Sequence, residues 1–378
     1  MQAIPFGDLG VTVSRLGMGC MRLPTRQEGD NTVIDRPAAI SLIRNAIDGG
    51  VTYVDTAYGY HNGESEIVTG LALKDGYRQR VSLATKLPCW HVEKESDMDR
   101  LLDEQLGKLQ VDSVDFYLLH ALNKGSFEKM QRLGYQRFLE KAKADGRIRF
   151  ACFSFHDDAE TFRNIIDDYH WDMAQVQMNY LDEENQATLE GIHYAGRKGV
   201  GIVVMEPLRG GALASPPDNV AKLIEAQTPK RSPVDWAFAW LTQYPEVKVI
   251  LSGMSNQQQL DENLAFFADT KTEPLPEDER RFIQMLKKAY NDRIQVGCTG
   301  CRYCMPCPQG VSITDLFIHY DEAHMFDRLP RFEKFYKSRV EKRSDASLCV
   351  ECGACESACP QGIPIIESLK RIRSEFGA

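Results

Sequence analysis

Short apolar strands alternate with amphipathic helices along residues 1–296, and this alternation limits the possible folds more than any other feature. A regular strand–helix alternation is typical of α/β proteins, in which helices cover a parallel sheet. Eight strands, each followed by a helix, favour a closed (β/α)₈ TIM barrel over an open sheet. The predicted strands are residues 15–20, 53–57, 81–86, 114–120, 149–156, 173–180, 201–208 and 247–254.

Helix and hairpin signals support this reading. Residues 38–49 carry apolar side chains at helical spacing and end at Gly49 and Gly50, a helix stop. Residues 257–267 follow the last strand in the same way. The opening segment, 3–13, predicts a hairpin that plugs the bottom of the barrel.

A second module is expected after the barrel. Residues 270–279 are rich in Pro and Glu and indicate a linker, and 281–294 predict a helix that leads into a block of cysteines. We therefore expect a barrel domain at 1–280 and a small ferredoxin-like iron–sulfur domain, with its linker helix, at 281–378.

Composition narrows the partners and the compartment. The net charge is −9, with 45 basic against 54 acidic side chains, which disfavours nucleic acid or an acidic membrane as a partner. No apolar run approaches the roughly 18 residues of a membrane span, and the first residues lack the features of a signal peptide. We expect a cytoplasmic protein, whose thiols stay reduced.

Eight of the 11 cysteines lie after residue 297, which indicates metal binding rather than disulfides. The second run of four, with spacings of two, two and three residues before a proline, resembles the bacterial ferredoxin pattern for a [4Fe–4S] cluster. In the first run, two residues instead of three separate the third cysteine from the fourth. The runs are Cys298, Cys301, Cys304 and Cys307, then Cys349, Cys352, Cys355 and Cys359.

In two-cluster ferredoxins the fourth cysteine of each run ligates the other cluster. The resemblance thus implies two [4Fe–4S] clusters, one held by Cys298, Cys301, Cys304 and Cys359 and the other by Cys349, Cys352, Cys355 and Cys307. Zinc is the alternative, but structural zinc sites use pairs of cysteines separated by longer spacers. The clusters either carry electrons or brace a small module.

Four ionisable side chains stand at predicted strand ends, where such barrels place their catalytic groups. These are Asp55, Tyr60, Lys86 and His120. A tyrosine is a poor proton donor near neutral pH unless a cation stabilises its phenolate. Lys86 supplies that cation, Asp55 keeps the lysine charged, and His120 can hold a carbonyl oxygen. The set is suited to protonating an oxygen while hydride reaches the adjoining carbon.

The segments around these residues strongly resemble the aldo-keto reductase family. The resemblance is carried by residues 55–60, 63–66, 84–86 and 115–120, in family order. It covers nearly all of 1–296 and implies a (β/α)₈ barrel, NAD(P)H as hydride donor, Tyr60 as general acid, and Asp55, Lys86 and His120 as its support.

The resemblance also implies cofactor contacts. On the nicotinamide side they are Ser154, Gln177 and Met205. Pro207 and Leu208 lie in the segment 205–211, which matches the family's loop along the pyrophosphate. On the adenosine side they are Gly253, Gln259, Glu262 and Asn263. NADP(H) is favoured over NAD(H), although Gly253 and Gln259 stand where the family often places cations against the 2′-phosphate. Arg209 is a candidate replacement, and NADH stays open. Cys20, Met21, Trp90 and His91 are candidates for the lining of a substrate pocket.

Three functions are compatible with these features. The first is NAD(P)H-dependent reduction of a small aldehyde or ketone, with the clusters structural or connected to an electron-transfer protein. The second is an oxidoreductase whose clusters deliver single electrons to a substrate in the barrel. The third is a redox-sensing protein that binds a partner, since a fold does not fix a function.

Overall fold

The structure is a computed structural model that describes residues 1, 3–268 and 272–377. Residues 270 and 271 of the expected linker lie outside the described residues. The chain divides into two compact units. The first contains Met1–Gly210 and Asp235–Leu275, and the second contains Gly211–Val234 and Pro276–Ala378.

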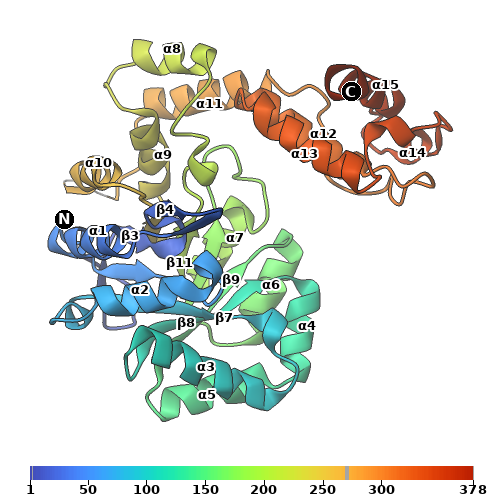
Figure 1. Ribbon diagram of the computed structural model, residues 1–378. Coiled ribbons are helices and arrows are strands. Elements are labelled where there is room, and N and C mark those ends of the chain that lie inside the picture. Colours follow the sequence, from blue (N-terminus) through green and yellow to red (C-terminus); the bar gives the residue numbers. More distant parts are fainter. Residues whose placement is uncertain (2, 269–271, 378) are drawn as a thin grey trace. The chain divides into compact units, whose positions relative to one another are not determined.

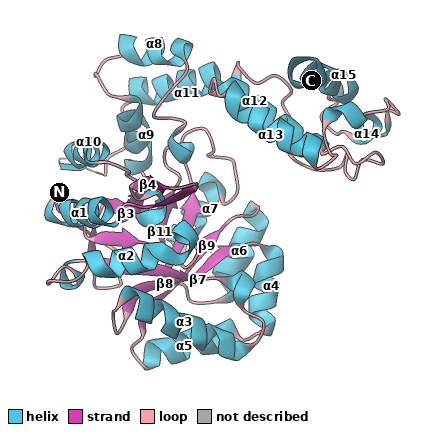
Figure 2. Ribbon diagram, viewed as in Figure 1, coloured by secondary structure: helices cyan, strands magenta, loops and turns pink. Residues whose placement is uncertain are grey.

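The first unit contains a closed barrel of eight parallel strands, as the alternation predicts (Figures 1 and 2). Around the barrel the order is β10, β11, β12, β3, β6, β7, β8, β9. The strands are β3 (Leu16–Gly19), β6 (Tyr53–Asp55), β7 (Ser82–Leu87), β8 (Val114–Leu122), β9 (Ile148–Phe155), β10 (Met173–Gln177), β11 (Gly201–Met205) and β12 (Val247–Ser252). Because all eight run in the same direction, their carboxyl ends meet at one end of the barrel.

Helices connect these strands and cover the outside of the barrel (Figure 2). They are α1 (Arg36–Asp48), α2 (Glu64–Ala72), α3 (Glu95–Leu109), α4 (Lys124–Arg132), α5 (Tyr135–Ala144), α6 (Ala159–Asp168), α7 (Thr188–Arg197), α9 (Pro233–Thr242) and α10 (Gln257–Ala268). Local sequence sets the ends of α1. The Asp35 carboxylate accepts a hydrogen bond from the backbone N–H of Ala38, and Gly50 leaves the helix at φ +98°.

The predicted N-terminal hairpin is confirmed. Strands β1 (Ala3–Pro5) and β2 (Thr12–Ser14) pair antiparallel. Phe6 is fully buried and its ring centroid lies 5.0 Å from that of Phe116, inside the barrel core. A second hairpin, β4 (Thr25–Glu28) with β5 (Asn31–Ile34), was not expected from the sequence.

The second unit is helical and has a core of its own. It contains α8 (Asp218–Ala226), α11 (Glu277–Asn291), α12 (Ile313–Met325), α13 (Leu329–Glu341), α14 (Ala354–Ala358) and α15 (Ile365–Phe376). Large side chains of α12, α13 and α15 form a buried cluster, which includes Phe317, Tyr320, Phe332, Tyr336 and Leu369. Six of the eight late cysteines pack partly buried against this core. The module therefore has an apolar core in addition to its thiols.

Two helical glycines give opposite predictions for stability. A Cβ at Gly70 in α2 would lie 2.3 Å from the backbone oxygen of Leu109 in α3, whereas a Cβ at Gly107 in α3 meets nothing within 4 Å. We expect Gly70→Ala to lower the free energy of unfolding by about 1–3 kcal/mol through overpacking, and Gly107→Ala to raise it by about 0.5–1 kcal/mol. Denaturant unfolding of both variants checks this, and equal effects would contradict the close α2–α3 contact.

Candidate active site and cysteine cavities

Four predicted catalytic side chains come together at the carboxyl end of the barrel. Asp55 ends β6, Lys86 is near the end of β7, His120 is near the end of β8, and Tyr60 lies in the turn after β6. The fully buried Lys86 ammonium donates three hydrogen bonds, to Asp55 Oδ1 at 2.7 Å, to the backbone oxygen of Thr56 at 2.8 Å and to Tyr60 OH at 3.3 Å. All three of its protons are therefore used.

The geometry leaves the Tyr60 proton available. An ammonium group only donates hydrogen bonds, so the phenol oxygen accepts from Lys86 and its own proton points elsewhere. Burial raises the pKa of Tyr60, although the Lys86 charge acts in the opposite direction. The phenol therefore stays protonated at neutral pH, and Lys86 is in place to stabilise the phenolate once the proton leaves.

Lys86 itself stays charged. Burial alone would lower the pKa of Lys86, but the negative charge and hydrogen bond of Asp55, with the contribution of Tyr60, more than offset it and raise the pKa. This is the role that the sequence predicts for the aspartate.

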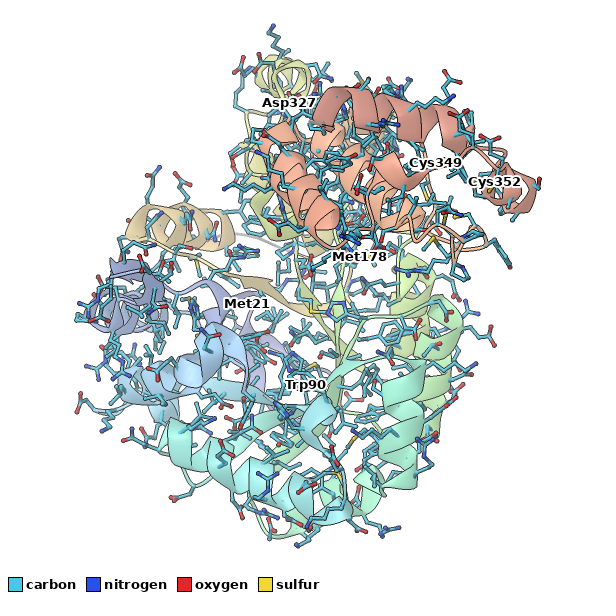
Figure 3. The ribbon with its side chains drawn as sticks, turned by 45° about the vertical axis from the view of Figure 1, so that its right-hand side comes forward. Met21, Trp90, Met178, Asp327, Cys349 and Cys352 are labelled. Carbon is cyan, nitrogen blue, oxygen red and sulfur yellow. The ribbon has the colours of Figure 1, made fainter. Side chains whose placement is uncertain are left out.

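His120 is neutral. Burial, with smaller effects of Lys86 and His156, lowers the pKa of His120 to about 3. Its Nδ1 atom is buried and has no hydrogen-bond partner among the residues that the structure describes. The Trp90 ring lies 5.1 Å from the His120 ring and is 50% exposed, and Met21 is 58% exposed (Figure 3). A neutral imidazole next to the exposed Trp90 ring can donate a hydrogen bond to a carbonyl oxygen without competing for the proton of Tyr60.

A buried polar network behind Lys86 was missed in the sequence. Gln105 of α3 donates to the Lys86 backbone oxygen at 3.0 Å and to Glu66 Oε1 at 2.6 Å, and it accepts from Tyr117 OH at 2.8 Å. Thr85 also donates to Glu66, at 2.6 Å. Gln105 stands on the apolar stripe of α3, and a polar residue on such a stripe is the signal that would have identified it.

The predicted nicotinamide contacts lie at the carboxyl ends of β9, β10 and β11. Ser154 is buried and its Oγ accepts from the Ala121 N–H at 2.7 Å. The Gln177 amide donates to Asp182 at 2.7 Å and accepts from Asn185 at 3.3 Å. Met205 is partly buried at the end of β11. Nearby, Gln175 Oε1 is buried without a hydrogen-bond partner in the described part of the chain.

Asp182 is a residue that sequence analysis missed, in the loop after β10. Its carboxylate accepts from the amides of Gln177 and Asn179 and lies 3.6 Å from Arg209 Nε. The Arg209 guanidinium therefore faces this carboxylate. Pro207 is buried and Leu208 partly buried in the turn before Arg209.

The predicted adenosine-side residues lie after β12. The Arg22 side chain packs against Gly253. A Cβ at residue 253 would lie 3.3 Å from the Cβ atom of Arg22. The Gln259 side chain accepts from the Ser255 N–H at 2.8 Å at the start of α10. Glu262 is exposed and accepts from Gln258 at 2.9 Å, while Asn263 is buried and donates to Ser252 Oγ at 2.9 Å.

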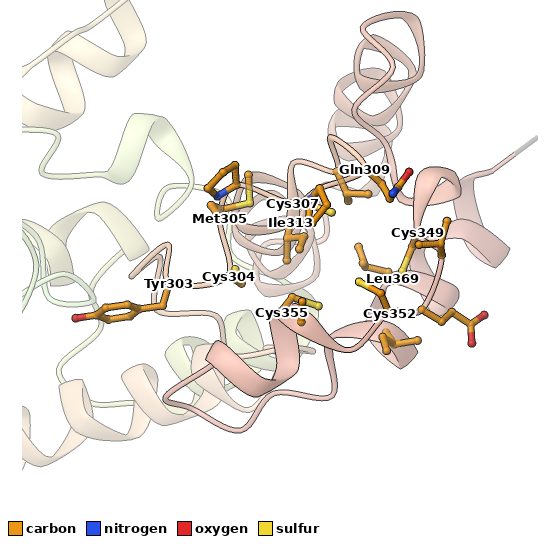
Figure 4. Close-up of a pocket in the computed structure, with 17 residues that line it drawn as sticks. Tyr303, Cys304, Met305, Cys307, Gln309, Ile313, Cys349, Cys352, Cys355 and Leu369 are labelled. Carbon is orange, nitrogen blue, oxygen red and sulfur yellow. The ribbon is translucent and has the colours of Figure 1, made fainter.

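The eight late cysteines line two adjoining cavities in the second unit. The first, of about 150 Å³, has Cys304, Cys307, Cys349, Cys352 and Cys355 in its lining (Figure 4). The second, of about 20 Å³, has Cys298, Cys301, Cys304 and Cys359. Of these eight cysteines, Cys304 alone borders both cavities. The first cavity thus has Cys307 of the first run beside three cysteines of the second run, and the second cavity has Cys359 of the second run beside three cysteines of the first.

Comparison with known proteins agrees with this geometry. The model of the Aldo/keto reductase family matches residues 15–283, and the model of a 4Fe-4S dicluster domain matches residues 297–363. No helix in the described ranges is both long and apolar enough to cross a membrane.

The alignments with individual relatives cover most of the length of each relative. The chain is 27% identical over 311 residues to the NADH-specific methylglyoxal reductase of Escherichia coli, covering 70% of this chain and 93% of that protein. It is 25% identical over 303 residues to probable aldo-keto reductase 1 of Glycine max, covering 71% and 85%. The structure of aldo-keto reductase AKR11C1 from Bacillus halodurans in its holo form has a TM-score of 0.64 at 25% identity, covering 76% of this chain and 96% of that one. The chain therefore belongs to the aldo/keto reductase family of oxidoreductases and carries a C-terminal 4Fe-4S dicluster domain.

Proposed function

We propose that this enzyme reduces a small aldehyde or ketone with NAD(P)H, with Tyr60 as the general acid. The observation that carries the proposal is the buried Lys86 ammonium, which contacts the Tyr60 oxygen at 3.3 Å and Asp55 at 2.7 Å. A nicotinamide dinucleotide, when bound, supplies the hydride. Tyr60 gives its proton to the carbonyl oxygen, and Lys86 stabilises the phenolate that remains. Neutral His120 orients the carbonyl oxygen by donating an N–H hydrogen bond to it.

The residues of the barrel fit such a cofactor. Buried Gln175 Oε1 has no hydrogen-bond partner in the described structure, and Ser154, Gln177 and Met205 lie at the same end of the barrel. Ser154 and Gln177 would hold the carboxamide, and Met205 would contact the ring. One relative is named as NADH-specific, and this chain has Gly253 and Gln259 at the positions that the family often gives to cations, so both NADPH and NADH are tested as hydride donors.

We further propose two [4Fe–4S] clusters in the C-terminal domain, held by Cys298, Cys301, Cys304 and Cys359 and by Cys349, Cys352, Cys355 and Cys307. The lining of the two cavities supports this assignment, because each set borders one cavity. The clusters would pass single electrons, whereas nicotinamide supplies two electrons as hydride.

The experiment follows the hydride. Anaerobically purified protein is incubated with NADPH or NADH deuterated at the transferable C4 position and with a panel of small aldehydes and ketones that includes methylglyoxal. We expect alcohol products that carry the deuterium at the former carbonyl carbon, as hydride transfer requires. Alcohol without deuterium, formed while reduced clusters become oxidised, would instead support single-electron delivery from the clusters and overturn the proposal.

A further inference from the structure

We propose that Arg22 is a cofactor-binding residue whose guanidinium holds the pyrophosphate of the dinucleotide. The inference rests on the proposed function, because it requires that the barrel bind NAD(P)H. Arg22 is exposed and ends the single 3₁₀ turn Cys20–Arg22 that follows β3. No sequence motif indicated a role for Arg22, and the inference rests on its contacts in the structure.

The main chain of Arg22 is fixed beside the loop after β12. Strands β3 and β12 pair in parallel, with Met18 opposite Ser252, so the segments that leave these strands run next to each other. The Ser255 hydroxyl donates to the Arg22 backbone oxygen at 2.9 Å. On the other side, the N–H of Leu23 donates to His61 Nε2 at 3.2 Å. The loops after β6 and β12 therefore hold the turn between them.

The aliphatic part of Arg22 uses the space that a side chain at residue 253 would need. A Cβ at Gly253 would lie 3.3 Å from both Cβ and Cδ of Arg22 and 3.4 Å from Cγ. A lysine at this position, as the family often has, would press against the stem of the arginine and require it to shift. The glycine at 253 and the position of Arg22 are therefore one structural feature, in which an arginine from the first loop lies where the family's cation would stand.

The guanidinium extends from Gly253 toward Gly210. A Cβ at Gly210 would lie 3.3 Å from Arg22 Nη2, and Gly210 has φ +64°, which favours glycine. Gly210 follows Pro207 and Leu208 in the segment that matches the pyrophosphate loop of the family. The charged end of Arg22 thus reaches the pyrophosphate side, and its stem lies on the adenosine side.

The charge of Arg22 is available for a ligand. Within the described residues, no carboxylate lies within 4.0 Å of its guanidinium, whereas Arg209 has Asp182 at 3.6 Å. A planar guanidinium donates two parallel hydrogen bonds to phosphate oxygens. Arg22 can therefore bind the diphosphate without first breaking an ion pair.

Binding measurements on the full-length, cluster-loaded protein test the assignment. The titrants are NADH, NADPH, ADP-ribose, which contains the pyrophosphate, and 2′-AMP, whose only phosphate is the 2′-phosphate. Calorimetry or quenching of protein fluorescence gives Kd. We expect Arg22→Gln to raise the Kd of the first three by about tenfold or more, because charge-assisted hydrogen bonds are lost. The Kd of 2′-AMP should not change.

Two variants serve as controls. Arg22→Lys keeps the charge but not the paired donors, so we expect an intermediate Kd. Arg26→Gln removes an exposed charge that pairs with Glu28 in the β4–β5 hairpin, and we expect the Kd of every titrant to stay at its wild-type value. An unchanged Kd for NADH, NADPH and ADP-ribose in Arg22→Gln would overturn this inference and leave the proposed function standing. A loss of affinity confined to NADPH and 2′-AMP would do the same, because it would place Arg22 at the 2′-phosphate. A wild-type protein that binds none of the dinucleotides would overturn the proposed function as well.

Discussion

Replacing Tyr60 by phenylalanine should lower kcat for carbonyl reduction by about 10²–10⁴-fold, the usual contribution of a positioned general acid. The change removes only the phenol oxygen, which lies 3.3 Å from Lys86 Nζ. No other described phenol contacts this ammonium, so no second tyrosine takes its place. The ring should keep its position, with the Lys86 ammonium 4.9 Å from its centroid. Steady-state kinetics with the best aldehyde of the panel measures the effect.

Tyr58→Phe is the matched control. The Tyr58 hydroxyl donates to Glu104 at 3.0 Å and the Lys108 ammonium lies 3.7 Å from the ring, so this tyrosine belongs to the polar surface next to α3. We expect wild-type kcat in this variant and an unchanged Kd for NAD(P)H in both. If Tyr60→Phe kept a tenth or more of the wild-type kcat, the proton would have to come from another group, and the proposed role of Tyr60 would be wrong.

The same geometry predicts which pH range leaves the acid intact. Burial holds the pKa of Tyr60 above its usual value of 10, so the phenol is protonated throughout the neutral range. His120, with a pKa of about 3, does not change its charge there either. Any loss of turnover between neutral pH and mild acidity would therefore have to arise outside this pair.

Much of the barrel could be predicted because its strands are buried on both faces and appear in the sequence as short apolar runs. The four residues of the site could be located because each stands at the end of such a run or shortly after it. The sequence did not predict the direction in which the fold shifts the pKa of Tyr60. Lys86 does favour the phenolate, but the pKa of Tyr60 is raised because burial has the larger effect, and burial depends on the whole fold.

The missed features share another cause, since they depend on contacts between distant segments. Gln105 reaches Lys86 across 19 positions, and Arg22 lies against Gly253 only because β3 pairs with β12. Local backbone changes were also missed. Gly134, at φ +75°, divides the connection after β8 into α4 and α5, where the alternating pattern predicted a single helix.

Substituting one cysteine from each cavity should remove one cluster at a time. Cys301 borders only the second cavity and Cys352 only the first, and both are exposed, so a serine at either position disturbs little packing. Two [4Fe–4S] clusters contain about eight iron atoms and about eight sulfide ions. We expect Cys301→Ser and Cys352→Ser each to retain about four of each ion per chain, and the double variant to retain none.

Cys89→Ser is the control for loss of a thiol elsewhere. Cys89 is buried beyond β7 and its Sγ donates to the Leu87 backbone oxygen at 3.5 Å, a bond that a serine hydroxyl can also make. This variant should keep the full iron and sulfide content. Analysis of iron and acid-labile sulfide on anaerobically purified protein gives the numbers, and electron paramagnetic resonance of the reduced protein shows whether neighbouring spins interact.

The pattern of losses tests the crossed assignment of the fourth cysteines. Cys307 borders the cavity of Cys349, Cys352 and Cys355, and Cys359 borders the other, so their substitutions should spare different clusters. Cys307→Ser combined with Cys352→Ser should therefore still leave about four irons, whereas Cys307→Ser with Cys301→Ser should leave none. The reverse result would show that each run closes its own cluster, and zinc without sulfide in the wild-type protein would contradict both clusters. The spectrum of an isolated cluster in Cys352→Ser would identify the centre that Cys298, Cys301 and Cys304 hold together with Cys359.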